Sequence, residues 1–104
     1  MISKETILDQ IELTPSHIIQ LRFRKQLVED GKVLSSEYHR TALEPGVLLV
    51  SQLALVNAHL AAMGWPPVPA SATGRIQAVV ALEHTPAVIQ AHQAQIQAHR
   101  NRLR

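Results

Sequence analysis

Apolar and polar residues alternate along the stretch 19–27 of the chain. The apolar members sit at odd positions and the polar members between them: Ile19, Leu21, Phe23 and Leu27 against Gln20, Arg22, Arg24 and Gln26. A period of two places successive side chains on opposite faces of a strand. The pattern therefore predicts a strand with one face in the core and the other in water.

A tight turn follows this strand. Asp30-Gly31 is the dipeptide favoured in two-residue hairpin loops, because both central residues of a type I′ turn need positive φ. A returning strand is predicted over about 33–41. Residues 5–13 alternate more loosely and end at the turn candidate 14–17, where proline and serine favour a reversal. We therefore predict a three-stranded antiparallel meander over about 5–41, with strands paired in chain order.

Three helices are predicted after the sheet. The first spans about 47–63, and Gly64 ends it ahead of two prolines. The second spans about 73–83. The third, about 86–102, begins with Thr85 as N-cap and a proline at its first position. Apolar residues recur at helical spacing in the first two helices: Leu49, Leu53, Val56, Leu60, Ile76, Val79 and Val80.

These elements predict an α+β fold in one domain covering residues 1–104, with two or three helices packed on the meander. The apolar face of the strand at 19–27 is expected to meet the apolar stripe of the first helix. The residues of this expected contact are Ile19, Leu21, Phe23 and Leu27 against Leu49, Leu53, Val56 and Leu60.

Composition limits the classes of function. With 46% apolar residues the chain can build a core, and a net charge of +2 is low for a nucleic-acid-binding domain. The absence of cysteine excludes disulfides and zinc–thiolate sites. The opening MISKETILDQ lacks the apolar region of a secretory signal, and no apolar stretch is long enough to span a membrane. We expect the protein to act in a cytoplasm, or in an assembly built there.

No constellation of residues indicates catalysis. None of the six histidines has a histidine partner four residues away, as a helical zinc site requires. Ser35 and His39 share a face of one predicted strand, but four residues of strand span about 13 Å, too far for a hydrogen bond. We therefore expect no enzyme activity, no metal site and no cofactor.

Basic residues gather on the predicted hairpin and at the C-terminal end. Arg22 and Arg24 lie on the wet face of their strand, and Arg100, Arg102 and Arg104 belong to the last segment. Two interpretations stay open. The arginines could form a solvated sheet face, or they could contact nucleic-acid phosphates without reading sequence.

The last helix carries a heptad-like pattern. Ile89, Ile96 and Leu103 recur every seven residues, and His92 and His99 each follow three positions later. This indicates an oligomer seam with apolar a and polar d positions. A helix laid on its own sheet would explain the pattern too. The residues we expect to make protein contacts are Arg22, Arg24 and Tyr38 on the sheet and Ile89, His92, Ile96 and His99 on the helix.

Three segments resemble small proteins encoded among the tail and tail-fibre genes of bacteriophages and prophages. They are TILDQIEL with the strand pair IIQLRFRKQLVEDGKVLSSEYHRTALEPG, the helix end VNAHLAAMGWPPVP, and RIQAVVALEHTPAVIQAH. The resemblance implies a virion structural protein of the tail tip or baseplate. It also implies other tail proteins as partners and no catalysis, and the heptad-like pattern of the last helix adds a homo-oligomer as an option. The alternative is a nucleic-acid-binding accessory protein that uses the basic hairpin and tail.

Overall fold

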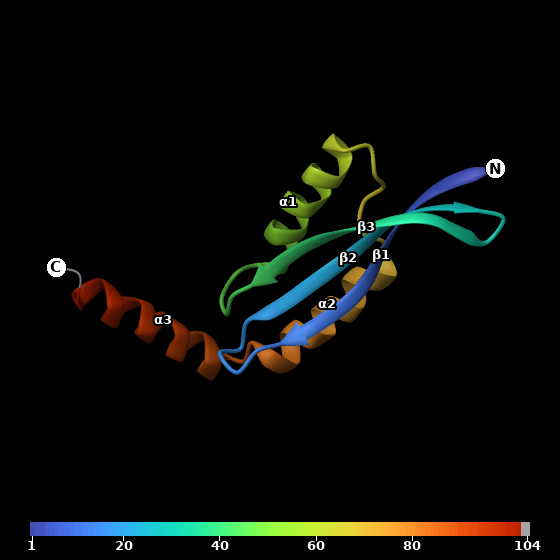
Figure 1. Cartoon of the computed structure of the whole chain (residues 1–104). Helices are drawn as coiled ribbons and strands as arrows, with labels where there is room; N and C mark the ends of the chain where they lie inside the picture. The colour runs from blue at the N-terminus through green and yellow to red at the C-terminus, as the bar shows by residue number, and fades with distance from the viewer. Residues whose placement is uncertain (103–104) are drawn as a thin grey trace.

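The computed structural model describes residues 1–102 and begins with an antiparallel sheet in the order β1-β2-β3. The strands are β1 (Ile2–Leu13), β2 (Ile19–Glu29) and β3 (Lys32–Leu43). Three helices follow, α1 (Leu49–Ala62), α2 (Ala70–Glu83) and α3 (Pro86–Arg102) (Figure 1). The predicted α+β class and the meander are confirmed. The strands extend beyond the predicted 5–41 at both ends of the sheet.

The two turns of the meander have different geometries. Asp30 and Gly31 both adopt positive φ, 50° and 79°, as a two-residue hairpin loop of this kind requires. At the other turn His17 also has positive φ, 65°. There the Thr14 hydroxyl accepts a hydrogen bond from the Ile18 amide at 3.1 Å. This side-chain bond supports the reversal between β1 and β2.

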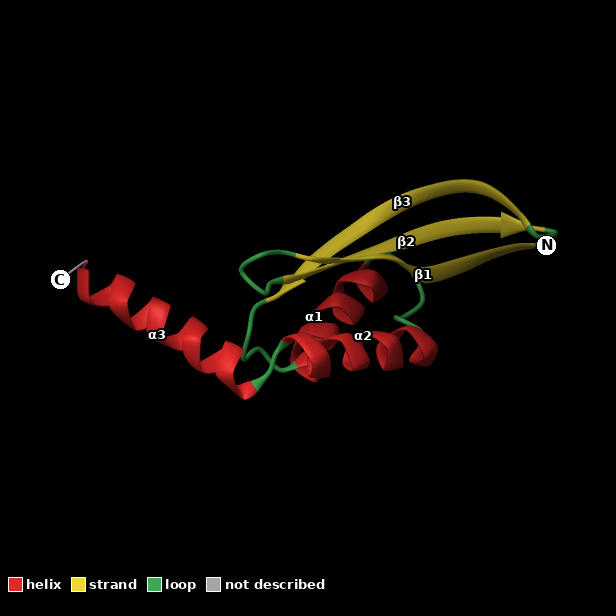
Figure 2. Ribbon diagram, turned by 90° about the horizontal axis from the view of Figure 1, so that it is seen from below, coloured by secondary structure: helices red, strands yellow, loops and turns green. Residues whose placement is uncertain are grey.

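Helices α1 and α2 cover one face of the sheet (Figure 2). The core lies between the two layers and contains Ile19, Leu21, Phe23, Leu43, Leu53, Val56, Leu60, Val68, Ala72 and Ile76. The predicted contact between β2 and α1 is therefore confirmed for Ile19, Leu21 and Phe23. On β1 a bulge at Asp9 shifts the register, so that Leu8 and Ile11 both point to this core face opposite Phe23 and Leu21.

The prediction that Leu27 belongs to the core is wrong. Leu27 is only half-buried, because the helix layer ends before it and the strands continue beyond the helices. The end of that layer is tied to the sheet by side chains. Lys4 Nζ donates to the Gly64 carbonyl at 3.1 Å, and the Thr6 hydroxyl donates to the Pro66 carbonyl at 2.7 Å.

Helix α3 leaves the body of the molecule at the end opposite the hairpin tip (Figure 1). None of its described residues is buried. The molecule measures 57 × 28 × 20 Å, and its radius of gyration of 16.5 Å exceeds the roughly 13 Å expected of a compact chain of this length. The interpretation that the last helix lies on its own sheet is therefore wrong. None of the helices within residues 1–102 is both long and apolar enough to cross a membrane.

Candidate interaction site

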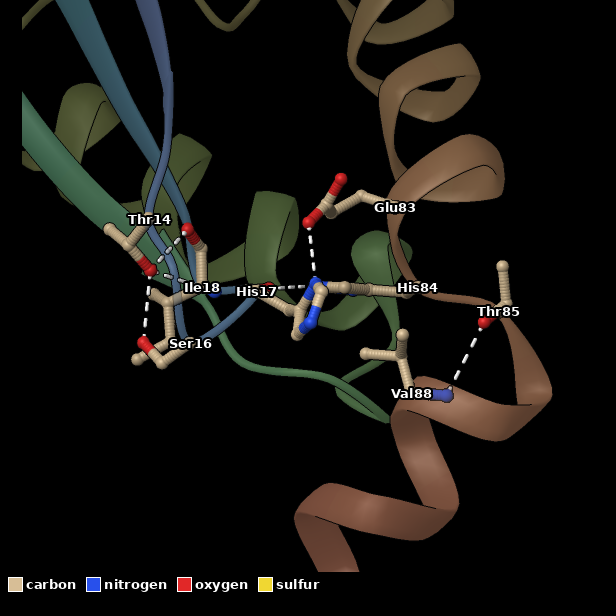
Figure 3. Close-up of polar contacts among 8 residues, drawn as sticks. All are labelled: Thr14, Ser16, His17, Ile18, Glu83, His84, Thr85 and Val88. Atoms are coloured by element: carbon tan, nitrogen blue, oxygen red, sulfur yellow. Dashed lines mark hydrogen bonds and ion pairs between the residues drawn. The ribbon is translucent and has the colours of Figure 1, made fainter.

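The joint between α2 and α3 is held against the β1–β2 turn by two histidines (Figure 3). The ring of His84 is buried, and its Nε2 lies 2.7 Å from the His17 carbonyl oxygen, to which it donates. The His17 ring in turn contacts the Glu83 carboxylate, with Nδ1 2.7 Å from Oε1. We call His17, Glu83 and His84 the latch. The latch ties the end of α2, just before the start of α3, to the β1–β2 turn.

The first turn of α3 follows the rules for helix starts. The Thr85 hydroxyl accepts a hydrogen bond from the Val88 amide at 3.3 Å, and the Thr85 carbonyl accepts one from the Ile89 amide at 3.0 Å (Figure 3). Pro86 occupies the first helical position, where its missing amide hydrogen costs nothing. The start predicted at Thr85-Pro86 is thus confirmed.

The first part of α3, residues 86–92, which we call its root, contacts the loop between β3 and α1. A Cβ placed on Gly46 would lie 3.4 Å from Cγ2 of Ile89, so the loop approaches the helix closely. Gly46 also has a φ of 93°, which favours glycine. His92 Nε2 lies 3.6 Å from Glu44 Oε2. At this distance the two side chains form an ion pair if the imidazole carries a proton. Ile89 and His92 therefore serve to seat the helix.

Beyond this root α3 is exposed. Every residue from Gln93 to Arg102 is exposed, including Ile96 at 38%. At 100° per residue, Ile96 and His99 lie on the same side of the helix as Ile89 and His92. The predicted contact face therefore divides into a root that touches its own domain and a tip that does not. Leu103 and Arg104, which the predicted seam and the predicted basic tail include, lie outside the described residues.

Arg22, Arg24 and Tyr38 come together on the sheet face opposite the helices. Arg22 Nε donates to Asp9 Oδ2 at 2.6 Å, and Arg24 Nη1 lies 3.6 Å from Asp9 Oδ1. The Arg22 guanidinium also stacks 4.5 Å from the centroid of the Tyr38 ring, within cation–π range. Both arginines are half-buried. Asp9, the bulge residue of β1, offsets much of the positive charge that the sequence places here.

A shallow hollow of about 330 Å³ lies beside Arg22 on this outer face. Mostly polar side chains line it, among them Gln10, Glu12, Gln20 and Arg40. On the opposite face, burial lowers the pKa of His39 below its ordinary value, and the charges of Lys25 and then His59 lower it further. No group of three metal-ligating side chains gathers within residues 1–102.

The structure separates the two predicted sets of contact residues. Arg22, Arg24 and Tyr38 form one cluster on the sheet, whereas Ile96 and His99 lie on the projecting half of α3. Sequence reasoning missed Asp9, because the bulge breaks the alternation around it. It also missed the latch, since His84 and the His17 carbonyl that it contacts lie 67 residues apart in the chain. A positive φ at His17 is not visible in a hydropathy pattern.

Neither a protein-family model, nor a curated protein, nor a solved structure matches this chain.

Proposed function

We propose that this chain is a non-enzymatic structural or adaptor protein of a phage tail or baseplate, which acts in the virion through protein–protein contacts. The observation that carries the proposal is the projecting helix α3. It has 17 residues, none of them is buried, and the latch fastens the joint from which it departs.

The tip of α3 receives little support from its own domain. Isolated helices shorter than about 12–15 residues are marginal in water. The part of α3 from Gln93 to Arg102 continues a helix that starts at Pro86, but all its residues are exposed, so it gains little from tertiary packing on its own domain. Docking against another protein supplies that packing. A firmly seated root with an unsupported tip therefore suits a helix that is completed by a partner.

The charge of α3 indicates the chemistry of that partner. The helix contains no acidic residue, and its last turn carries His99, Arg100 and Arg102. Its exposed side presents Ile96 next to these basic groups. We infer that the partner offers an apolar groove with acidic residues at one end. The assignment to a phage tail rests on the three resembling segments.

Incorporation into particles tests this proposal. Ile96→Asp places a charge on the proposed contact side, and Ala98→Asp places the same charge on the opposite side of the same helix. In phage particles made with each variant and purified, we expect immunoblots to show Ala98→Asp at wild-type levels. Ile96→Asp should be reduced at least tenfold.

The same experiment can contradict the proposal in two ways. A wild-type protein that is absent from purified particles would refute a virion role. Equal incorporation of the two variants, both folded by circular dichroism, would refute docking through α3. Salt-sensitive co-purification of the isolated protein with nucleic acid would instead favour the accessory-protein alternative.

A further inference from the structure

The outer face of the sheet, opposite the helices, has two parts that differ in how their polar side chains are paired. In the middle of this face Asp9 binds Arg22 and Arg24. Nearer the hairpin tip the Gln26 amide donates to the Glu5 carboxylate at 2.7 Å. Near the β1–β2 turn lies the hollow of about 330 Å³, which we call the outer hollow. Four side chains that line it take part in none of the hydrogen bonds or ion pairs within residues 1–102: Gln10, Glu12, Gln20 and Arg40.

The register of the strands brings these side chains together. Arg40 on β3 lies directly opposite Arg22 on β2, and Gln20 lies opposite both Glu12 on β1 and Ala42 on β3. Directly paired residues point to the same side of a sheet, with their Cβ atoms about 4.5–5.5 Å apart. The small side chain of Ala42 leaves room between its larger neighbours, and the surface is hollowed beside it.

The pair of arginines at the outer hollow is only partly neutralised. Like charges directly opposite one another destabilise a sheet. Asp9 holds Nε and Nη2 of Arg22 from the β1 side, and the Tyr38 ring stacks on the same guanidinium, so Arg22 is fixed in orientation. Arg40, by contrast, has no acidic partner within 4 Å among residues 1–102. An anion placed between the two guanidinium groups would relieve their repulsion and use donors that the protein leaves free.

The other residues of the outer hollow favour a single carboxylate on a peptide as the anion. A guanidinium matches a carboxylate with two parallel hydrogen bonds. Glu12 borders the hollow on β1, two strand spacings, or about 10 Å, across the sheet from the strand of Arg40. A nucleic-acid strand would bring a row of phosphates towards Glu12 and Asp9, which repel them, whereas one carboxylate need not approach these acids. Gln10 and Gln20 offer both donors and acceptors, as the backbone of a bound peptide requires.

We propose that the outer hollow binds an aspartate or glutamate side chain of a partner protein, with its carboxylate between Arg22 and Arg40. Gln10 and Gln20 hold the neighbouring peptide groups. This proposal rests on the function proposed above in one respect, namely that the partner is a protein, and it does not use α3. The hollow lies near the β1–β2 turn, to which the latch ties the base of α3, so both contact regions are at the same end of the sheet (Figure 1).

A titration of the ¹⁵N-labelled protein, followed through the arginine Nε–H signals by NMR, tests the site. The probe is the blocked tripeptide acetyl-Gly-Glu-Gly-amide, and acetyl-Gly-Gln-Gly-amide is its uncharged control. We expect the Arg22 and Arg40 signals to shift saturably with the glutamate tripeptide, with a dissociation constant of about 1–10 mM. Arg40→Gln should raise this constant at least about fivefold. Arg75→Gln is the matched control and should leave it unchanged, because Arg75 is also exposed and lacks an acidic partner but lies on α2.

Three results would overturn the proposal. Shifts that do not saturate, or that are as large at Arg75 as at Arg40, would show general ionic attraction instead of a site. Equal binding of the glutamine tripeptide would rule out recognition of a carboxylate. Tighter binding of inorganic phosphate than of the glutamate tripeptide would assign the hollow to phosphate groups and favour the nucleic-acid alternative. All these measurements use the isolated protein, so their failure is distinct from absence of the protein from purified particles, which would refute the function proposed above.

Discussion

Replacing His84 with alanine should destabilise the protein more than breaking the ion pair next to it. The His84 ring is buried and donates to the His17 carbonyl at 2.7 Å. Truncation removes this partly buried bond together with the packing of a buried ring, which should cost about 1–3 kcal/mol. By contrast, the side chains of His17 and Glu83 are 49% and 23% exposed. Their pair is therefore worth about 0–1 kcal/mol, and Glu83→Gln is the matched control.

Urea denaturation followed by circular dichroism measures this difference. With a slope of about 1–3 kcal/mol per molar urea, a loss of about 2 kcal/mol lowers the midpoint by about 1 M. Glu83→Gln should lower it by less than half of that. If His84→Ala and Glu83→Gln have the same midpoint, the buried hydrogen bond does not hold the joint between α2 and α3, and the latch is refuted.

Two further predictions concern the core and pH. Phe23 is fully buried at the centre of the sheet, so Phe23→Ala should lower the free energy of unfolding by about 3–5 kcal/mol in the same urea assay; a loss below about 1 kcal/mol would show that the core is placed wrongly. His39 has a lowered pKa in the folded state, so the unfolded chain binds more protons and stability should fall as pH drops through about 6.5 towards the folded value. In His39→Gln that part of the pH dependence should disappear, and an unchanged profile from urea melts at several pH values would contradict the assignment.

The parts of the fold that depend on local pattern were predictable. Alternation marked β2, Asp30-Gly31 marked the hairpin, and Thr85-Pro86 marked the start of α3, because each rule concerns neighbours in the chain. The bulge at Asp9 was not predictable, since an extra residue in a strand shows only in its pairing with the next strand. The exposure of Leu27 depends on where the helix layer ends over the sheet, and the residues around Leu27 do not determine this.

In the candidate sites, too, features that depend on local pattern were predictable, and features that depend on distant contacts were not. The proposed contact side of α3 was read from heptad spacing, but a periodic stripe does not say which surface it meets, and the helix projects from the sheet. On the sheet, the arginines were placed on the correct face, yet their pairing with Asp9 depends on the register of β1.

Hydrogen exchange of the α3 tip tests the central claim most directly. The amides from Gln93 to Arg102 should exchange rapidly in the isolated protein, since all these residues are exposed and receive little packing from their own domain. In purified particles the same amides should become protected, because docking of α3 supplies that packing. Exchange that is equally fast in the particle would contradict docking through α3, and so would strong protection of this segment in the isolated monomer.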